Sequence, residues 1–450
     1  MLALPLAFSA ARGADADLQA LRDQIRALEQ KLLVLERKQE LKDEAAAAAA
    51  PSTPKITVND KGFTLASADG ANAIKLRGLV QLDARLFFGD GGAAAGLNNN
   101  AFVLRRARLI TEGTFAKNYS FQLVPEFGGS SVSILDANLN VFLTKGLQFR
   151  LGKFKSPLGL EQLQSDSWTF FNERSIVTNL VPNRDLGIQA WGDLADNRVS
   201  YAVGVFNGLA DAGSSTNTDF DNEKDIAARV TFSPFRNDAG SSLQGLTLGL
   251  AGSVGREKTV SGRPSGYRTD GQQTFFAYNS SVVSDGLNWR VSPQLDYRNG
   301  SFGLLSEYVG STVNVRPSAT GAKAELQNRA WQVAAGYVLT GEDSSYAGIV
   351  PRSNFDYAAG TWGAFEVTGR IARLDVDDAA FPLFASAASN ANQATSSAVG
   401  LNWYLSKTVV LKLDYYQTHF SFNAAAPSVP SAAVLRQDEK AFIARFQLGF

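Results

Sequence analysis

The chain contains no cysteine, so it can form no disulfide, no thiolate metal site and no lipid-modified cysteine near its N-terminus. The lack of cysteine fits an exported protein that avoids mispaired thiols. Its single histidine, His419, has no serine and acid partners that would complete a catalytic set in a pocket. The sequence therefore predicts no enzyme, no cofactor and no metal site. One acidic stretch is interpreted as a solvated loop, with a calcium site as the alternative, because it lacks EF-hand spacing: Asp211, Asp219, Asp221, Glu223 and Asp225.

Beyond its first residues the chain also lacks any run of about 18 apolar residues, so no transmembrane helix is predicted. Lys plus Arg and Asp plus Glu both number 43. This neutral balance gives no indication of nucleic acid or of another polyanionic partner. Any electrostatic function must come from where the charges lie.

The N-terminal part divides into three segments. Residues 1–16 combine a short apolar run with an Ala14-Asp15-Ala16 cleavage pattern, which predicts a signal peptide. The basic residues that normally open such a peptide are missing, as in a truncated signal peptide. The alternative is an apolar tail. Residues 17–44 carry a heptad seam that predicts a coiled-coil helix, or else a single amphipathic helix lying on its own domain: Leu18, Leu21, Ile25, Leu28, Leu32 and Leu35. Residues 45–54, rich in alanine and proline, are expected to be a linker.

From residue 55 to residue 450 the apolar residues recur at every second position, which predicts β-strands. Sixteen segments show this pattern or are rich in β-forming residues: 74–88, 101–116, 118–127, 132–144, 146–152, 185–194, 198–207, 223–234, 243–256, 286–298, 301–315, 326–340, 361–375, 394–405, 408–421 and 439–450. Their connections alternate between short turns and long loops, except that 341–360 is long where a short turn is needed. An even number of strands with this alternation predicts an antiparallel transmembrane β-barrel.

Several motifs resemble the phosphate-selective porin O and P family. They are Arg105–Leu109, Gly152–Glu161, Phe171–Ser175, Pro182–Gly187, Gly303–Tyr308 and Trp362–Glu366. The resemblance implies a trimeric, sixteen-stranded outer-membrane porin whose third loop folds into the lumen; several members carry an N-terminal coiled coil. It also implies an anion site at Arg105 and Arg106 on the second strand, with Asp136 close to it. Arg108 stands where the family's phosphate channels have a tyrosine.

The candidate pore-lining residues follow from these patterns. Strict alternation places Arg106 and Arg108 on the inner face, and Arg105 reaches it only if a bulge lies between. Other cations are expected on inner faces, with Asp83 and Glu112 as partners: Arg77, Arg85, Arg150, Arg370 and Lys412. Four more lie where the long loop leaves and rejoins the wall: Lys153, Lys155, Arg174 and Arg184. Guanidinium and ammonium groups bind oxyanions, but these residues could equally tie the loop down through Glu161, Asp166, Glu173 and Asp185.

The sequence thus predicts an outer-membrane porin for small anions such as phosphate, or for small polar solutes. We expect a homotrimer in contact with outer-membrane lipid and lipopolysaccharide, with the helix in the periplasm. The alternative is a structural protein that tethers the outer membrane to the cell wall through its coiled coil.

Overall fold

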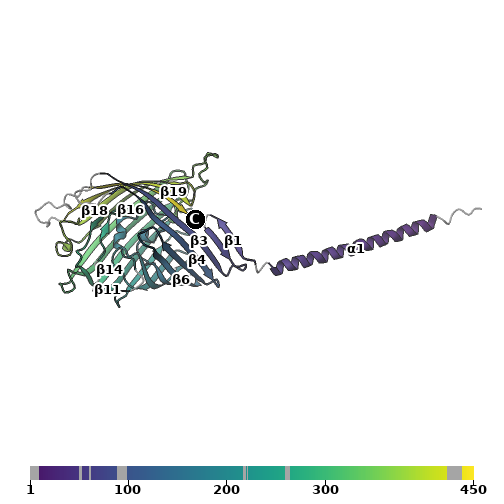
Figure 1. Cartoon of the computed structure of the whole chain (residues 1–450), viewed down its shortest axis with the longest axis horizontal. Helices are drawn as coiled ribbons and strands as arrows, with labels where there is room; N and C mark the ends of the chain where they lie inside the picture. The colour runs from purple at the N-terminus through teal and green to yellow at the C-terminus, as the bar shows by residue number, and fades with distance from the viewer. Residues whose placement is uncertain are drawn as a thin grey trace, which may run out of the picture.

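The structure, a computed structural model, describes residues 10–49, 53–59, 62–88, 99–215, 219, 221–258, 264–422 and 438–450, with side chains from residue 19 to residue 45 in the first range. In these residues sixteen antiparallel strands close into a barrel, and an N-terminal helix projects from it (Figure 1). All sixteen strands lie where the sequence predicts them.

The barrel strands, in chain order, are β3 (Ala73–Phe88), β4 (Ala101–Phe115), β5 (Tyr119–Glu126), β6 (Ser133–Thr144), β7 (Leu147–Lys155), β8 (Arg184–Leu194), β9 (Val199–Phe206), β10 (Asp225–Phe232), β11 (Leu246–Lys258), β14 (Val283–Asn299), β15 (Phe302–Arg316), β16 (Ala324–Val338), β17 (Ala364–Asp375), β18 (Gln393–Tyr404), β19 (Val409–Ser421) and β20 (Glu439–Gly449). We call the end with the short turns the turn end and the opposite end the loop end.

The barrel closes where β20 pairs with β3, from Lys440 opposite Phe88 to Gly449 opposite Leu79. The terminal Phe450 continues this seam, exchanging two backbone hydrogen bonds with Gly78 at 2.8 and 3.1 Å. A Cβ on Gly78 would lie 2.3 Å from the Phe450 ring, so only glycine leaves room for the terminal aromatic residue.

A hairpin that the sequence analysis did not predict extends the wall at this seam. It consists of β1 (Lys55–Asn59) and β2 (Gly62–Ala66). β2 pairs with the first residues of β3, beyond the point where β20 ends. Phe63 packs edge-on against Phe450, with ring centroids 6.2 Å apart. The hairpin therefore covers the edge of β3 that β20 leaves unpaired.

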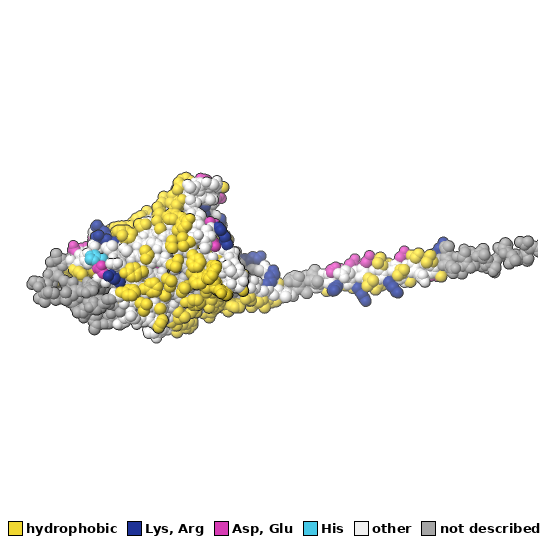
Figure 2. Space-filling view, turned by 90° about the horizontal axis from the view of Figure 1, so that it is seen from above, with side chains coloured by type: hydrophobic (Ala, Val, Ile, Leu, Met, Phe, Trp, Pro, Cys, Tyr) yellow, Lys and Arg dark blue, Asp and Glu magenta, His cyan; other side chains and the backbone are white. Residues whose placement is uncertain are grey.

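The N-terminal helix α1 spans Ala10–Ala49. It takes in Ala45–Ala49, which the sequence analysis placed in the linker, because alanine has the highest helix propensity of any residue. Residues 1–9 of the expected signal peptide lie outside the described residues. Acidic side chains follow one edge of the helix and basic side chains the other, with apolar residues between them (Figure 2). Neither α1 nor any other described helix has the length and apolar character needed to cross a membrane.

The strands alternate apolar and polar residues between the outer and inner faces. Along β3, for example, Leu82 and Leu86 are exposed on the outside, whereas Asp83 and Arg85 are buried on the inside. The outer surface of the barrel is largely apolar in the view of Figure 2. Such a surface suits lipid or the apolar face of another subunit.

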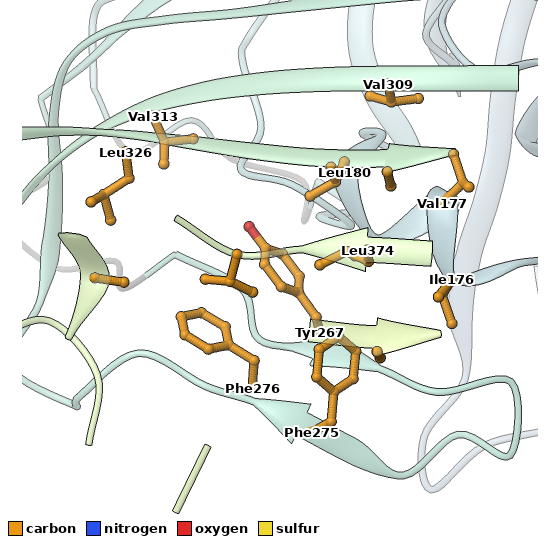
Figure 3. Packing of buried hydrophobic residues seen from close by; sticks show 14 of the residues in the cluster. Ile176, Val177, Leu180, Tyr267, Phe275, Phe276, Val309, Val313, Leu326 and Leu374 are labelled. Atoms are coloured by element: carbon orange, nitrogen blue, oxygen red, sulfur yellow. The ribbon is translucent and has the colours of Figure 1, made fainter. Parts of the chain in front are cut away.

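Apolar residues fill the loop end of the lumen on one side. Three loop elements meet β15–β17 there: η2 (Ile176–Leu180), the hairpin of β12 (Tyr267–Arg268) and β13 (Thr274–Phe276), and η3 (Asp378–Ala380). Their side chains pack against inward-facing residues of the strands, including Val309 and Leu374 (Figure 3). Apolar packing thus takes up part of the loop end of the lumen beside these strands.

The connection between β16 and β17 is the long segment that the sequence placed at a short-turn position. It folds back toward the lumen, where the Tyr346 hydroxyl donates to the Leu160 carbonyl at 2.6 Å. Gln164 donates to the Tyr346 carbonyl at 2.9 Å. The segment therefore contacts the third loop from the turn end of the barrel.

Candidate functional site

The third loop, residues 156–183 between β7 and β8, crosses the lumen and contains α2 (Leu160–Leu163) and η2. Carboxylates on the far wall hold its backbone. Glu307 on β15 accepts from the Leu160 amide at 2.6 Å, and Asp414 on β19 accepts from the Asn172 amide at 2.6 Å. The loop is therefore fixed to the β15–β19 side and faces β4 across the remaining space.

The arginine pair of β4 reaches the lumen through a β-bulge. Gln81 of β3 pairs with Arg106 and the next residue, Leu82, pairs with Leu104, so Arg105 is the extra residue. This bulge lets both Arg105 and Arg106 point toward the third loop, as the sequence analysis required if both were to face inward.

Three guanidinium groups converge on Asp166 of the third loop. Arg106 lies 3.1 Å from its carboxylate, and Arg108 and Arg174 also form ion pairs with it. Burial by itself would raise the pKa of Asp166, but the charges of the three arginines outweigh it and hold the pKa well below the ordinary 3.8. The carboxylate is therefore ionised and links β4 to the loop.

Glu173 forms a second centre of the same kind. Arg105 pairs with it at 2.6 Å, Arg85 at 2.9 Å and Arg445 at 3.0 Å. Here too burial would raise the pKa, and the charges of Arg105 and Arg445 keep it well below the ordinary value. Of the four cations expected to tie the loop down, Arg174 pairs with a loop acid, Asp166. Four cations for which no such pairing was predicted also pair with loop acids: Arg85, Arg105, Arg106 and Arg108.

The other predicted residues lie around these centres. Arg184 pairs with Asp136 at 3.0 Å, which places both on the wall beside the loop. Lys155 donates to the carbonyls of Gln162 and Gln164 at 2.6 and 3.0 Å. Lys153 points elsewhere, donating to the Ser215 carbonyl at 2.6 Å, so it does not join the arginines of β4.

Two further predicted cations lie nearer the turn end. Arg77 forms a bidentate pair with Glu112, at 3.0 and 2.8 Å, as expected for a cross-strand partner. Arg150 has no carboxylate partner among the described residues. Its guanidinium lies over the rings of Phe154 and Trp191 instead, 5.6 and 5.2 Å from their centroids.

Two cavities lie on either side of the third loop. The loop-end vestibule, about 610 Å³, is lined by four cations and one carboxylate: Arg105, Arg106, Arg174, Arg268 and Glu173. The turn-end vestibule, about 560 Å³, is lined by seven cations and three carboxylates: Lys75, Arg77, Arg108, Arg150, Lys155, Arg184 and Lys407, with Glu112, Asp136 and Asp166. The arginines around Asp166 contribute to both vestibules, so this centre marks the constriction.

A third set of charges lies behind the loop. Sequence reasoning placed Arg370 on an inward face but identified neither its acid partners nor the role of Arg445. Arg370 pairs with Asp270 at 2.9 Å and with Glu161 at 3.4 Å. Burial raises the pKa of Asp270 more than Arg370 and the Ser396 hydroxyl lower it. Arg445 pairs with Asp83 at 2.6 Å. The alternation of β17 and β20 places both arginines inward, but nothing in the sequence indicates which distant acid each one meets.

The acidic stretch 211–225 has the partners of a structural loop. Asp211 pairs with Arg290 at 2.7 Å, Asp219 with Lys224 at 2.5 Å, and Glu223 with Lys258 at 2.9 Å. No group of three or more potential metal ligands occurs in the parts of the chain that are described.

Comparison with solved structures supports the fold. The outer membrane channel DcaP of Acinetobacter baumannii aligns with a TM-score of 0.54 and 12% identity, over 84% of this chain and 98% of that one. An anion-selective porin from Comamonas acidovorans aligns with a TM-score of 0.51 and 13% identity, over 84% of this chain and 100% of that one. The trimer form of OmpT, an outer membrane protein of Vibrio cholerae, aligns with a TM-score of 0.50 and 10% identity, over 84% of this chain and 100% of that one. A comparison with curated proteins gives no match.

These neighbours are an outer membrane channel, a porin and an outer membrane protein, and their low identity shows the fold alone. The family assignment comes from the sequence. Residues 74–450 match the profile of the family described as phosphate-selective porin O and P. The match begins at the first barrel strand and ends at the last residue, so it covers the whole barrel and leaves out α1 and the β1–β2 hairpin. The chain is an outer-membrane porin of the phosphate-selective porin O and P family.

Proposed function

We propose that this porin conducts small anions, including phosphate, in preference to cations. The observation that carries the proposal is the excess of cations in both vestibules, in a chain whose charges balance overall at 43 of each sign. Selectivity in a pore comes from its radius and from the charges at its narrow part. Many of the described carboxylates line neither cavity, for example Asp211, Asp270 and Glu307.

An anion entering the loop-end vestibule meets Arg105, Arg106 and Arg174 before it reaches the constriction. Beyond Asp166 it meets Arg108, Lys155 and Arg184. Guanidinium groups bind oxyanions through paired N–H donors, and the ammonium group of Lys155 acts as a point charge. Because Asp166 and Glu173 already accept from most of these arginines, we expect weak, fast binding rather than tight retention of phosphate.

The reversal potential of single channels in a KCl gradient tests this proposal. In a KCl gradient the equilibrium potentials of chloride and potassium have opposite signs. If the channel prefers anions, the reversal potential has the sign of the chloride equilibrium potential. A reversal potential with the sign of the potassium equilibrium potential would overturn the proposal. Phosphate added to the KCl solution should lower the chloride current at millimolar rather than micromolar concentration, in line with the weak binding expected above.

We further propose that three copies assemble and that their α1 helices form a periplasmic coiled coil. The apolar seam of α1 packs against none of the residues that the structure describes: Leu21, Ile25, Leu28, Leu32 and Leu35 are 48–64% exposed. Burying such a seam against copies of itself is the usual role of a heptad repeat. The trimer form of a fold neighbour, OmpT, is consistent with three subunits.

The absence of native cysteine makes this assembly simple to test. A Leu28→Cys variant, with the cysteine in the seam, should form interchain disulfides under mild oxidation. A Gln30→Cys variant, with the cysteine on the opposite face, is the matched control and should remain uncrosslinked. Equal crosslinking at both positions would contradict the coiled coil.

The structural alternative, a tether to the cell wall, rests on the length of α1. Its 40 residues extend about 60 Å at 1.5 Å per residue. Deletion of residues 17–50 separates the two roles. If envelope integrity fails while solute uptake is unchanged, tethering is the main role; if uptake or trimer stability falls and the envelope stays intact, the helix serves the channel.

A further inference from the structure

Arg150 differs from the other predicted pore arginines. Seven of them form ion pairs with carboxylates: Arg77, Arg85, Arg105, Arg106, Arg108, Arg174 and Arg184. Arg150 pairs with none of the described acids, and its Nε is buried without a hydrogen-bond partner. Its charge is therefore balanced by no described carboxylate, whereas the charges of the others are already shared with the protein. Arg150 also lines two cavities, where a solute can approach it.

The aromatic side chains around Arg150 are fixed in place. Trp191 donates its indole N–H to Asn140 at 2.8 Å, and Phe154 packs edge-on against Phe206 with centroids 5.5 Å apart. The N–H donors of a guanidinium point outward in its plane, so contact of its face with an aromatic ring leaves them able to form hydrogen bonds. The fixed rings of Phe154 and Trp191 therefore hold the Arg150 guanidinium in one orientation.

A side pocket of about 300 Å³ opens beside Arg150, and we define it by Arg150, Lys155, Leu163, Trp191, Tyr201 and Arg229. Its one carboxylate among the described residues, Asp193, accepts from the Ser200 hydroxyl at 2.5 Å. Arg150 and Lys155 also line the turn-end vestibule, so the pocket adjoins the route of the permeating ion.

We propose that the side pocket binds small organic carboxylates that carry an apolar or aromatic body. This proposal rests on the anion channel proposed above and names the solute class of one site within it. The carboxylate would accept from the edge of the Arg150 guanidinium and from the Lys155 ammonium, which has one donor left after its two carbonyl contacts. The body of the solute would lie against Leu163, Trp191 and Tyr201.

The composition of the pocket favours an organic anion over inorganic phosphate. Five of its lining side chains are apolar or aromatic: Pro157, Leu163, Trp191, Tyr201 and Ala202. Phosphate has no apolar surface to bury against them. The pocket is also at the small end of the range of ligand sites. A single ring with one carboxylate fits such a site by charge and by chemistry.

Benzoate is a suitable probe, and block of single-channel KCl current is the readout. We expect wild type to show benzoate block at a concentration at least tenfold below that needed with phosphate. Arg150→Gln should raise the half-blocking benzoate concentration at least tenfold, and Trp191→Leu should raise it severalfold. Arg150→Lys, which keeps the charge and loses the fork, should fall between wild type and Arg150→Gln.

The matched control is Arg77→Gln, which removes one charge from the same vestibule, but a charge that Glu112 already shares. Its half-blocking benzoate concentration should stay within twofold of wild type. The reversal potential of Arg150→Gln should keep its sign, which separates this proposal from the selectivity of the channel. Equal benzoate block in wild type and Arg150→Gln, or phosphate block as strong as benzoate block in wild type, would overturn the proposal.

Discussion

On the side of the lumen formed by β3–β9 the inward side chains are charged and cavities remain open, whereas on the side formed by β15–β19 apolar residues fill the loop end. Both sides obey the same alternation of outward and inward residues. The difference lies in the type of inward residue. Apolar inward residues such as Val313 and Leu326 pack against loop residues. Charged ones such as Arg106 and Arg108 pair with Asp166 of the third loop and line the two cavities.

The largest change should come from breaking the apolar side. Phe276 is fully buried and stacks on Tyr267 with centroids 5.3 Å apart. Truncation of a buried phenylalanine costs about 3–5 kcal/mol. Phe276→Ala should therefore lower the temperature of heat denaturation and raise the single-channel conductance, because the loops no longer fill their half. Unchanged conductance would show that this side does not limit the pore.

Removing the carboxylate at the constriction should have the next largest effect. Asp166→Asn leaves Arg106, Arg108 and Arg174 close together without their shared anion. Breaking a buried pair on one side costs about 3–5 kcal/mol, and the remaining partners of these arginines reduce that loss. We expect stronger anion selectivity and phosphate block at roughly tenfold lower concentration. Asp296→Asn, which removes a carboxylate paired with Arg298 outside both vestibules, is the control and should match wild type in selectivity.

The pH dependence of stability should reveal the ion pairs of Asp166 with the three arginines. The pKa of Asp166 is lowered by the three arginines, so its carboxylate stabilises the folded chain at every pH above 3.8. That contribution is lost as pH falls from 3.8 through the lowered folded value. Wild type should denature at higher temperature than Asp166→Asn at pH 7, and the difference should shrink only below pH 3.8. A difference that vanishes between pH 5 and 7 would contradict the lowered pKa.

The smallest effect should come from a pair at the mouth of the charged side. Glu112 and Arg77 keep 27% and 34% of their side chains exposed. Exposed ion pairs contribute about 0–1 kcal/mol. Glu112→Gln should leave the denaturation temperature within a few degrees of wild type and shift the reversal potential slightly toward chloride. A large loss of stability would show that this pair is part of the buried network.

The barrel was predictable from the sequence because the alternation of apolar and polar residues is visible within each strand. The Arg105–Arg106 pair even indicated its bulge, since two adjacent charges cannot both face inward on a regular strand. The ion-pair partners were less accessible. Asp83 and Arg445 are 362 positions apart, and only the closed barrel makes them neighbours. The β1–β2 hairpin was missed because its strands are short, with five residues each, and leave little room for a period to show.

The seam between β3 and β20 also connects barrel closure to the third loop. Arg445 lies on the last strand, yet it pairs with Asp83 on the first barrel strand and with Glu173 on the third loop. Contacts this distant in sequence form late, after the loop-closure entropy of nearly the whole chain has been overcome. One guanidinium thus joins the last strand, the first barrel strand and the third loop, so barrel closure and loop attachment share the same buried contact.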